Sequence, residues 1–159
     1  MPIRNLSDAQ NLLKPGEKYM GLDVGKKTIG IAIGDPSHII ASPHRILWRR
    51  KFSSDMADLF KEMDELSIGG LIVGWPLNMD GTTGPRCDST RDFCYSLMKL
   101  RDVPVILHDE RLSTAAVERA MLEADMTRKR RHEKRDALAA SWILQSAFDR
   151  IGLGFDETS

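Results

Sequence analysis

The sequence predicts an α/β fold with a mixed sheet, and three observations support this prediction. Three β-rich runs follow one another between residues 18 and 48, and two short apolar runs come later, each after a segment with helical spacing. A meander followed by alternating helices and strands is typical of a mixed sheet. The 159 residues, 42% of them hydrophobic and 29% charged, fit one packed domain rather than a disordered or fibrous chain.

The first half of the chain holds the predicted meander. Residues 1–17 have a weak amphipathic pattern that ends at Pro15-Gly16, so we expect a short helix or a loose arm there. Two β-rich runs, YMGLDV and TIGIAIG, flank the polar turn Gly25-Lys26-Lys27, which is typical of a hairpin. The third run, HIIASPHRILW, contains Pro43, a residue type found near sheet edges and bulges.

The second half alternates helices with short strands. Helices are predicted behind Ser53 or Ser54 as the cap, behind Pro85, and behind Ser113 or Thr114. The runs LIVG at 71–74 and VPVILH at 103–108 are predicted strands. The main domain is expected to span 18–151 and the tail 152–159 to be mobile. The last helix is predicted from near Asp136, with a buried face of Ala140, Leu144, Ala147, Phe148 and Ile151.

Two further features of the sequence indicate the cellular location of the protein and the state of its cysteines. No segment has the roughly 20 apolar residues that cross a bilayer, and the N-terminal segment lacks the apolar core of a secretory signal. We therefore expect a cytoplasmic protein without a membrane partner. Cys87 and Cys94 lie about two helical turns apart, too far to bridge, and are expected to be buried thiols.

Charge is distributed unevenly along the chain. The formal net charge is zero, from 23 basic and 23 acidic residues, but residues 128–135 carry six basic side chains against Glu133 alone, a local charge of +5. Such clustering favours a polyanionic partner such as nucleic acid, and a solvated basic loop is the alternative. The basic residues of this run are Arg128, Lys129, Arg130, Arg131, Lys134 and Arg135.

Asp23 is the first candidate for catalysis. It lies in the apolar run LDVG, where burying a carboxylate costs several kcal/mol unless a metal ion, a charge or a hydrogen-bond donor compensates. Gly25 and Gly30 permit a tight turn and the close approach of a phosphate or of another backbone segment. The alternative is that Asp23 only hydrogen-bonds the hairpin turn.

Further acids stand at the ends of predicted elements. Asp109 and Glu110 follow a strand, and because successive side chains of an extended segment face opposite ways, only one of them can face Asp23. Periodicity does not choose between them, and either is also suited to cap the next helix. Asp136 precedes the last helix, where capping is again the alternative. Three dispersed acids are suitable ligands for a hard cation such as Mg²⁺, and two such ions stabilise both the attacking and the leaving oxygen of a phosphodiester.

Four segments resemble, in order and spacing, the YqgF/RuvX family of Holliday-junction resolvase-like proteins and pre-ribosomal-RNA nucleases. These segments are GLDVGKKTIGIAIGDP, IVGWPLNMDGTTGP, HDERLST and DALAASWILQ, and they cover about residues 18–150. The resemblance implies a ribonuclease-H-like fold, in which helices flank a mixed five-stranded sheet and a carboxylate cluster binds one or two Mg²⁺ or Mn²⁺ ions. It implies a metal-dependent nuclease that processes the 5′ end of pre-16S rRNA, with Holliday junction resolution as the alternative.

Carried over position by position, the resemblance assigns the catalytic and metal-binding acids to Asp23, Glu110 and Asp136, and so favours Glu110 over Asp109. Lys26 stands where the family usually has a small hydroxyl residue, and Trp75 stands where leucine is usual. Trp75 is expected either to stack on a base or to fill a hydrophobic gap. The positions expected around the nucleic acid are Lys26, Lys27, Asn78, Arg111, Thr114 and the six basic residues of 128–135.

The expected partner is pre-rRNA, with branched DNA and ribosomal particles as further candidates. We expect a monomer or a weak homodimer, because only symmetric cutting of two strands favours a dimer. Two other function classes share some of these features. The LDVG motif also resembles the phosphate loop of actin-like and sugar-kinase ATPases, which need a second domain that 159 residues do not supply. The second alternative class is a catalytically silent module that binds RNA or the transcription machinery. Retention of all three acids counts against this class.

Overall fold

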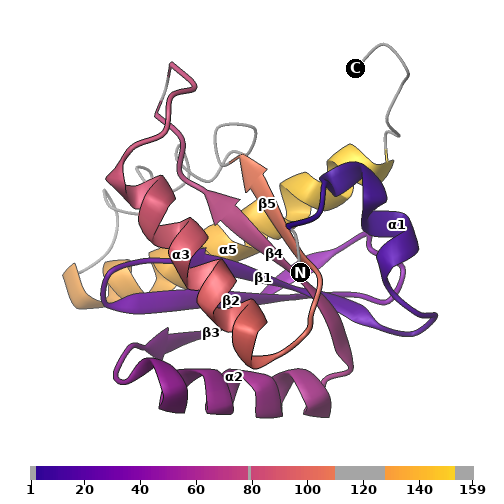
Figure 1. Cartoon of the computed structure of the whole chain (residues 1–159), viewed down its shortest axis with the longest axis horizontal. Coiled ribbons are helices and arrows are strands. Elements are labelled where there is room, and N and C mark those ends of the chain that lie inside the picture. The colour runs from indigo at the N-terminus through magenta and orange to yellow at the C-terminus, as the bar shows by residue number, and fades with distance from the viewer. Residues whose placement is uncertain (1–2, 79, 110–127, 153–159) are drawn as a thin grey trace.

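The computed structural model describes residues 3–78, 80–109 and 128–152, with residues 128–137 described by their backbone alone. Five strands form one sheet in the order β3-β2-β1-β4-β5 (Figure 1), and the predicted mixed sheet is confirmed. The first three strands are the antiparallel meander, and the last two join β1 in parallel. The bounds are β1 Lys18–Val24, β2 Thr28–Gly34, β3 Ala41–Trp48, β4 Ile68–Trp75 and β5 Val105–Asp109.

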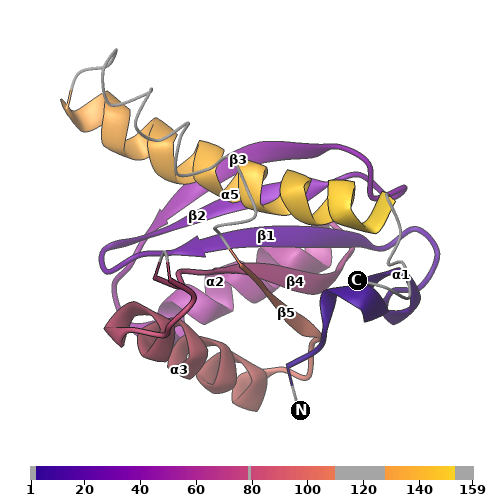
Figure 2. The same ribbon diagram turned by 90° about the horizontal axis from the view of Figure 1, so that it is seen from above.

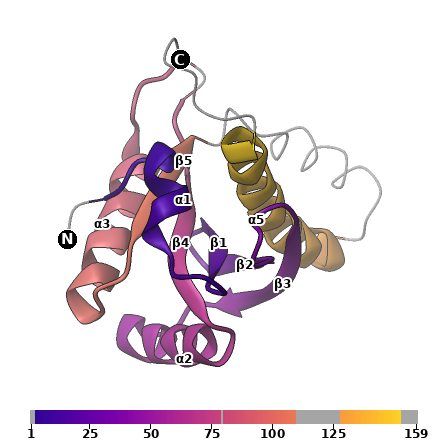
Figure 3. The same ribbon diagram turned by 90° about the vertical axis from the view of Figure 1, so that its right-hand side faces the viewer.

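Helices cover both faces of the sheet (Figure 3). α2 (Phe52–Glu65) and α3 (Pro85–Leu100) pack on one face, above a core that includes Leu22 and Val73. α5 (Arg128–Gly152) crosses the other face, above a second core cluster that includes Ile72. The central strands are therefore buried on both faces, which explains why they read as nearly continuous apolar runs.

The N-terminal segment packs against the sheet. It forms a short 3-10 turn, η1 (Leu6–Asp8), followed by α1 (Ala9–Leu12). Arg4 makes an isolated parallel bridge to Ile106 of β5. The hydroxyl of Tyr19 in β1 donates a hydrogen bond to the carbonyl oxygen of Ala9, and both residues are fully buried. This segment is therefore attached to the sheet at Arg4 and again at Ala9.

β3 is one of the two edge strands, and its start differs from the prediction. It begins at Ala41, because the carboxylate of Asp35 accepts hydrogen bonds from the amides of Ile39 and Ile40, each at 2.7 Å, and holds those residues in a turn. Pro43 lies on the edge strand beside a register shift, as predicted. Proline and a bulge both protect a sheet edge from pairing with another chain.

Two helix starts were predicted with different success. α2 begins at Phe52 with Lys51 at the N-cap, so the prediction of a cap at Ser53 or Ser54 is wrong. Both serines lie within the first turn, where the hydroxyl of Ser54 donates to the carbonyl oxygen of Lys51 at 3.0 Å. α3 begins at Pro85 as predicted. Its two cysteines, Cys87 and Cys94, are free and buried, which confirms the prediction made for them.

The last helix starts well before its predicted position. α5 begins at Arg128 rather than near Asp136, so the basic run is helical and the loop alternative is wrong. Lysine, arginine and glutamate are good helix formers, and no glycine or proline interrupts residues 128–135. The helix predicted behind Ser113 or Thr114 and the tail from residue 153 lie outside the described residues. In the part of the chain that the structure describes, no helix combines the length and apolar character needed to span a membrane.

Candidate active site

Asp23 lies near the carboxyl end of the central strand β1, and it is only 7% exposed. Its backbone pairs with Gly30 of β2 on one side, and on the other side β1 runs parallel to β4 and β4 to β5. The carboxyl ends of these three parallel strands therefore meet at one end of the sheet, where sites in open α/β sheets usually form. A carboxylate buried to this extent requires compensation, and a hard cation with oxygen ligands is one group that can supply it.

Asp23 lies on the face of the sheet that α5 covers. Side chains alternate along β1, so Asp23 shares its face with Tyr19 and Gly21, and Tyr19 packs in the core cluster beneath α5. A Cβ atom on Gly21 would lie 2.9 Å from the Cβ of Leu144 and 3.1 Å from the carbonyl oxygen of Ala140. The absence of a side chain at Gly21 therefore lets α5 approach the strand that carries Asp23.

The direction of α5 brings its position 136 to the level of Asp23. Phe148 packs beside the first residues of β1, whereas Ala140 packs over Gly21, so the helix runs antiparallel to the strand. One helical turn before Ala140 is about 5.4 Å. Two strand residues beyond Gly21 are about 6.6 Å, so the two backbone positions lie at a similar height along the sheet.

Asp136 lies in the third turn of α5 and not at the start of the helix. The interpretation of Asp136 as a residue that caps the helix start is therefore wrong, because a cap stands before the first turn. Its side chain is not among the described ones, and its role as a metal ligand stays a prediction.

At the end of β5, the structure separates Asp109 from Asp23. Asp109 pairs with Trp75, whose indole N–H donates a hydrogen bond to the sulfur of Cys87 on α3. This row of side chains therefore faces α3, on the side of the sheet opposite to Asp23. His108, the preceding residue, faces α5. Asp109 and Asp23 therefore lie on opposite faces of the sheet.

The remaining predicted ligands fall outside the structure. Glu110, Arg111 and Thr114 lie outside the described residues, so their assignment stays a prediction. Among the described side chains, which include Asp23 but neither Glu110 nor Asp136, no three His, Cys, Asp or Glu residues gather as a metal site.

His108 is a buried histidine between β5 and α5. Its side chain is 3% exposed, and its Nε2 lies 3.0 Å from the hydroxyl oxygen of Ser146 in a hydrogen bond. Burial lowers the pKa of His108 below the ordinary value of 6.5, so the ring is neutral at pH 7. This neutral imidazole belongs to the packing of α5 on the sheet.

Acidification is expected to destabilise the fold through His108. Because the pKa of His108 is lower in the folded than in the unfolded state, only the unfolded state gains a proton as the pH falls below about 6.5. The free energy of unfolding is therefore unaffected by this residue above that pH and decreases below it. Thermal melting at about pH 7.5 and about pH 5.5 measures the loss. His108→Gln should lose less stability between the two conditions than the wild type, and an equal loss would contradict the assignment.

Asn78 organises the loop that follows β4. Its backbone N–H donates to the carbonyl oxygen of Thr82 at 2.9 Å, and its side-chain amide donates to the hydroxyl of the same residue at 3.0 Å. Gly81, at a φ of +89°, completes the turn, and its N–H donates to the carbonyl oxygen of Asn78 at 2.8 Å. Asn78 is exposed and is therefore available to a ligand, but its first visible role is to close this loop.

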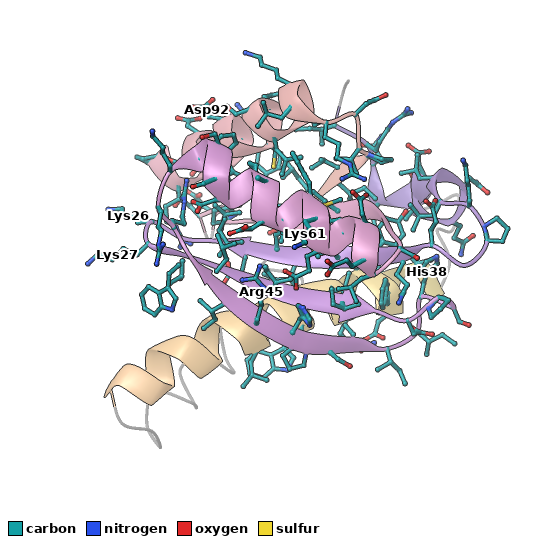
Figure 4. The ribbon with its side chains drawn as sticks, turned by 90° about the horizontal axis from the view of Figure 1, so that it is seen from below. Lys26, Lys27, His38, Arg45, Lys61 and Asp92 are labelled. Carbon is teal, nitrogen blue, oxygen red and sulfur yellow. The ribbon has the colours of Figure 1, made fainter. Side chains whose placement is uncertain are left out.

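A group of cations lies at the same end of the sheet as Asp23. Lys26 and Lys27 are exposed on the β1–β2 hairpin, and Figure 4 shows both side chains projecting from that end of the molecule. The first turns of α5, which carry the basic run, extend past this end of the sheet in Figure 2. This arrangement favours a polyanionic ligand near Asp23.

Arg49 belongs to the same region, although sequence reasoning missed it. Its guanidinium donates a hydrogen bond to the carbonyl oxygen of Gly25 at 2.6 Å, and its backbone N–H donates one to the carbonyl oxygen of Lys27 at 2.8 Å. Arg49 could have been found by aligning the third strand with the second in register from the hairpin, because this pairing places it beside Lys27. Trp75, by contrast, packs against α3, since its indole N–H donates to the sulfur of Cys87 and the guanidinium of Arg91 lies 5.0 Å from its ring centroid.

The sequence is similar to curated proteins that carry one shared name. A protein of Rhodobacter capsulatus named "Putative pre-16S rRNA nuclease" is 55% identical over 131 residues, which are 82% of this chain and 82% of the relative. A protein of the same name from Rhodospirillum rubrum is 49% identical over 152 residues, 95% of this chain and 94% of the relative.

The fold is also found among solved structures. A structure of Thermus thermophilus RuvC matches with a TM-score of 0.50 at 12% identity and covers 86% of this chain and 97% of that chain. This similarity confirms the predicted ribonuclease-H-like fold. The family model described as "RuvX: Holliday junction resolvase" matches residues 17–150, and the chain therefore belongs to the RuvX family.

Proposed function

We propose that this protein is a metal-dependent nuclease that hydrolyses a phosphodiester bond of pre-16S rRNA. The observation that carries the proposal is Asp23, a carboxylate that is 7% exposed at the end of β1 where three parallel strands meet. The family match and the names of the curated relatives support nuclease activity and pre-16S rRNA as the substrate.

We assign the catalytic acids to Asp23, Glu110 and Asp136. Asp109 faces α3, so alternation along β5 favours the next residue, Glu110, for the face of Asp23. The antiparallel course of α5 over β1 favours position 136 as the third. All three are carboxylate oxygen donors, the ligands that hard cations take, so this donor set fits Mg²⁺ or Mn²⁺.

In the proposed mechanism, the carboxylates of Asp23, Glu110 and Asp136 would hold the cation, and the basic side chains hold the substrate. When bound, such a cation would supply Lewis-acid stabilisation of the phosphoryl oxygens and would lower the pKa of a water. Burial of Asp23 restricts solvent around its carboxylate, which strengthens electrostatic interactions there. Lys26 and Lys27, exposed at the hairpin, contact backbone phosphates and orient the strand.

Cleavage of a four-way DNA junction is the second candidate, because the matching family model is described as a Holliday junction resolvase. The test compares, in one preparation with Mg²⁺ or Mn²⁺, the cleavage rates of a pre-16S rRNA 5′ fragment and of a synthetic four-way junction. We expect the rRNA fragment to be cleaved about 10-fold faster or more. Faster cleavage of the junction would make the four-way junction the preferred substrate instead of pre-16S rRNA. Cleavage of neither substrate would overturn the nuclease proposal and favour a silent binding module.

A further inference from the structure

Trp48 is a large aromatic residue that the fold leaves half exposed. It is the last residue of the edge strand β3, and 50% of its surface is accessible. Its backbone pairs with Thr28, the residue that follows the Lys26-Lys27 hairpin. The next residue, Arg49, is tied to the hairpin by the two hydrogen bonds described above. The position of Trp48 is therefore set by a well-anchored part of the backbone.

Trp48 lies on the same face of the sheet as Asp23. Leu47 packs in the core beneath α2, so its neighbour Trp48 stands on the opposite face, which α5 crosses. Asp23 of β1 pairs with Gly30 of β2, and Trp48 of β3 pairs with Thr28 of β2. The two residues are therefore two strands apart and offset by two residues along the strands. Strand spacings of about 4.8 Å and rises of about 3.3 Å per residue place the two backbones about 12 Å apart.

Four cationic residues lie close to Trp48 along the backbone or across its strand pairing. Lys26, Lys27, Arg50 and Lys51 are all exposed, and within the described residues none of the four forms an ion pair. The nearby carboxylate of Asp55 is buried and accepts a hydrogen bond from the amide of Arg50 at 2.9 Å. An exposed indole among cations is the combination by which proteins hold single-stranded nucleic acid, since the ring stacks on a base and the cations contact phosphates.

We propose that Trp48 is a stacking platform for an unpaired base of the substrate, about 12 Å from the acid Asp23. The platform selects single-stranded nucleic acid, because the faces of bases inside a duplex are covered by their neighbours. This inference rests on the proposed function only in taking nucleic acid as the ligand. It does not depend on which acids are catalytic. The phosphates on either side of the stacked base contact Lys26 and Lys27.

Equilibrium binding in EDTA tests the platform separately from cleavage. Fluorescence anisotropy with a labelled single-stranded RNA, a single-stranded DNA of the same sequence and a blunt duplex gives the dissociation constants. Trp48→Ala should weaken binding of both single strands about 5- to 100-fold, the effect of losing one base–aromatic stack. Binding of the duplex should change less than about twofold, because that interaction is electrostatic.

Variants with matched chemistry separate stacking from general damage. Trp48→Phe retains a ring and should recover most of the affinity. Trp48→Leu keeps an apolar side chain without a ring, should lose as much affinity as Trp48→Ala, and keeps the test valid if Trp48→Ala does not fold. Tyr95→Ala removes another exposed aromatic residue, 43% exposed on α3, and should leave binding unchanged. Lys26→Ala should weaken single strands and duplex alike and reduce the slope of log affinity against log salt by about 0.7 to 0.9.

Each result decides between the proposals. If folded Trp48→Ala or Trp48→Leu binds single strands within about twofold of wild type, the platform is overturned. Equal loss for single strand and duplex would also overturn it. Loss of single-strand affinity in a preparation that cleaves no substrate would support the platform while refuting nuclease activity, so the two failures are distinguishable.

Discussion

Asp23→Asn is expected to abolish metal-dependent cleavage while leaving the fold and the affinity for nucleic acid in place. Asparagine has nearly the shape of aspartate, so the buried position at the end of β1 can still be packed, but the negative charge that would hold a cation is lost. Metal ions contribute several kcal/mol to the stabilisation of a phosphoryl-transfer transition state. The cleavage rate should therefore fall about 10³-fold or more.

Thermal melting gives a second readout that does not depend on activity. A cation that binds only the folded state raises the melting temperature of the wild type in proportion to the logarithm of its concentration. This increase with Mn²⁺ should be absent or much smaller in Asp23→Asn. Asp109→Asn is the matched control, because Asp109 faces α3 and should keep both the cleavage and the metal-induced shift. Cleavage by Asp23→Asn at the wild-type rate would refute the assignment, as would loss of the metal shift in Asp109→Asn alone.

The sequence was sufficient to predict the sheet, because strands buried on both faces leave a strong local pattern. The hairpin around Gly25-Lys26-Lys27 and the start of α3 at Pro85 were also predicted from local signals. Local signals failed where two of them competed. The charge of residues 128–135 is compatible with a solvated loop and with a helix. Only the helix propensity of lysine and arginine favoured the helix that is observed. Ser53 and Ser54 are good caps, yet the helix starts before both of them.

The arrangement of the site depends on register between strands, which no single segment encodes. Periodicity shows that Asp109 and Glu110 face opposite ways, but not which way each faces. The pairing of Asp109 with Trp75, and the contact of Trp75 with Cys87, decide that Asp109 faces α3. Trp48 was missed for the same reason: its distance from Asp23 follows from two strand pairings rather than from its neighbours in the chain.

Gly21→Ala is expected to be among the most damaging single-methyl substitutions, although it lies away from the proposed chemistry. The added Cβ would lie 2.9 Å from the Cβ of Leu144 and 3.1 Å from the backbone oxygen of Ala140. Neither atom is the end of a flexible side chain, so α5 must move away from β1. Overpacking of this kind costs about 1–3 kcal/mol, which should lower the melting temperature by several degrees in a chain of this size.

The same displacement should reduce activity, because α5 carries position 136 one turn before the contact with Gly21. A shift of about 1 Å in a catalytic group can cost about 100-fold in rate. Gly152→Ala is the matched control, since its added Cβ would meet nothing within 4 Å at the end of the same helix, and it should change neither stability nor cleavage appreciably. If Gly21→Ala lost stability but cleaved at the wild-type rate well below its melting temperature, the spacing between α5 and β1 would not matter for catalysis. The assignment of Asp136 to the metal site would then lose its structural support, because that assignment requires the helix and the strand to be held at this distance.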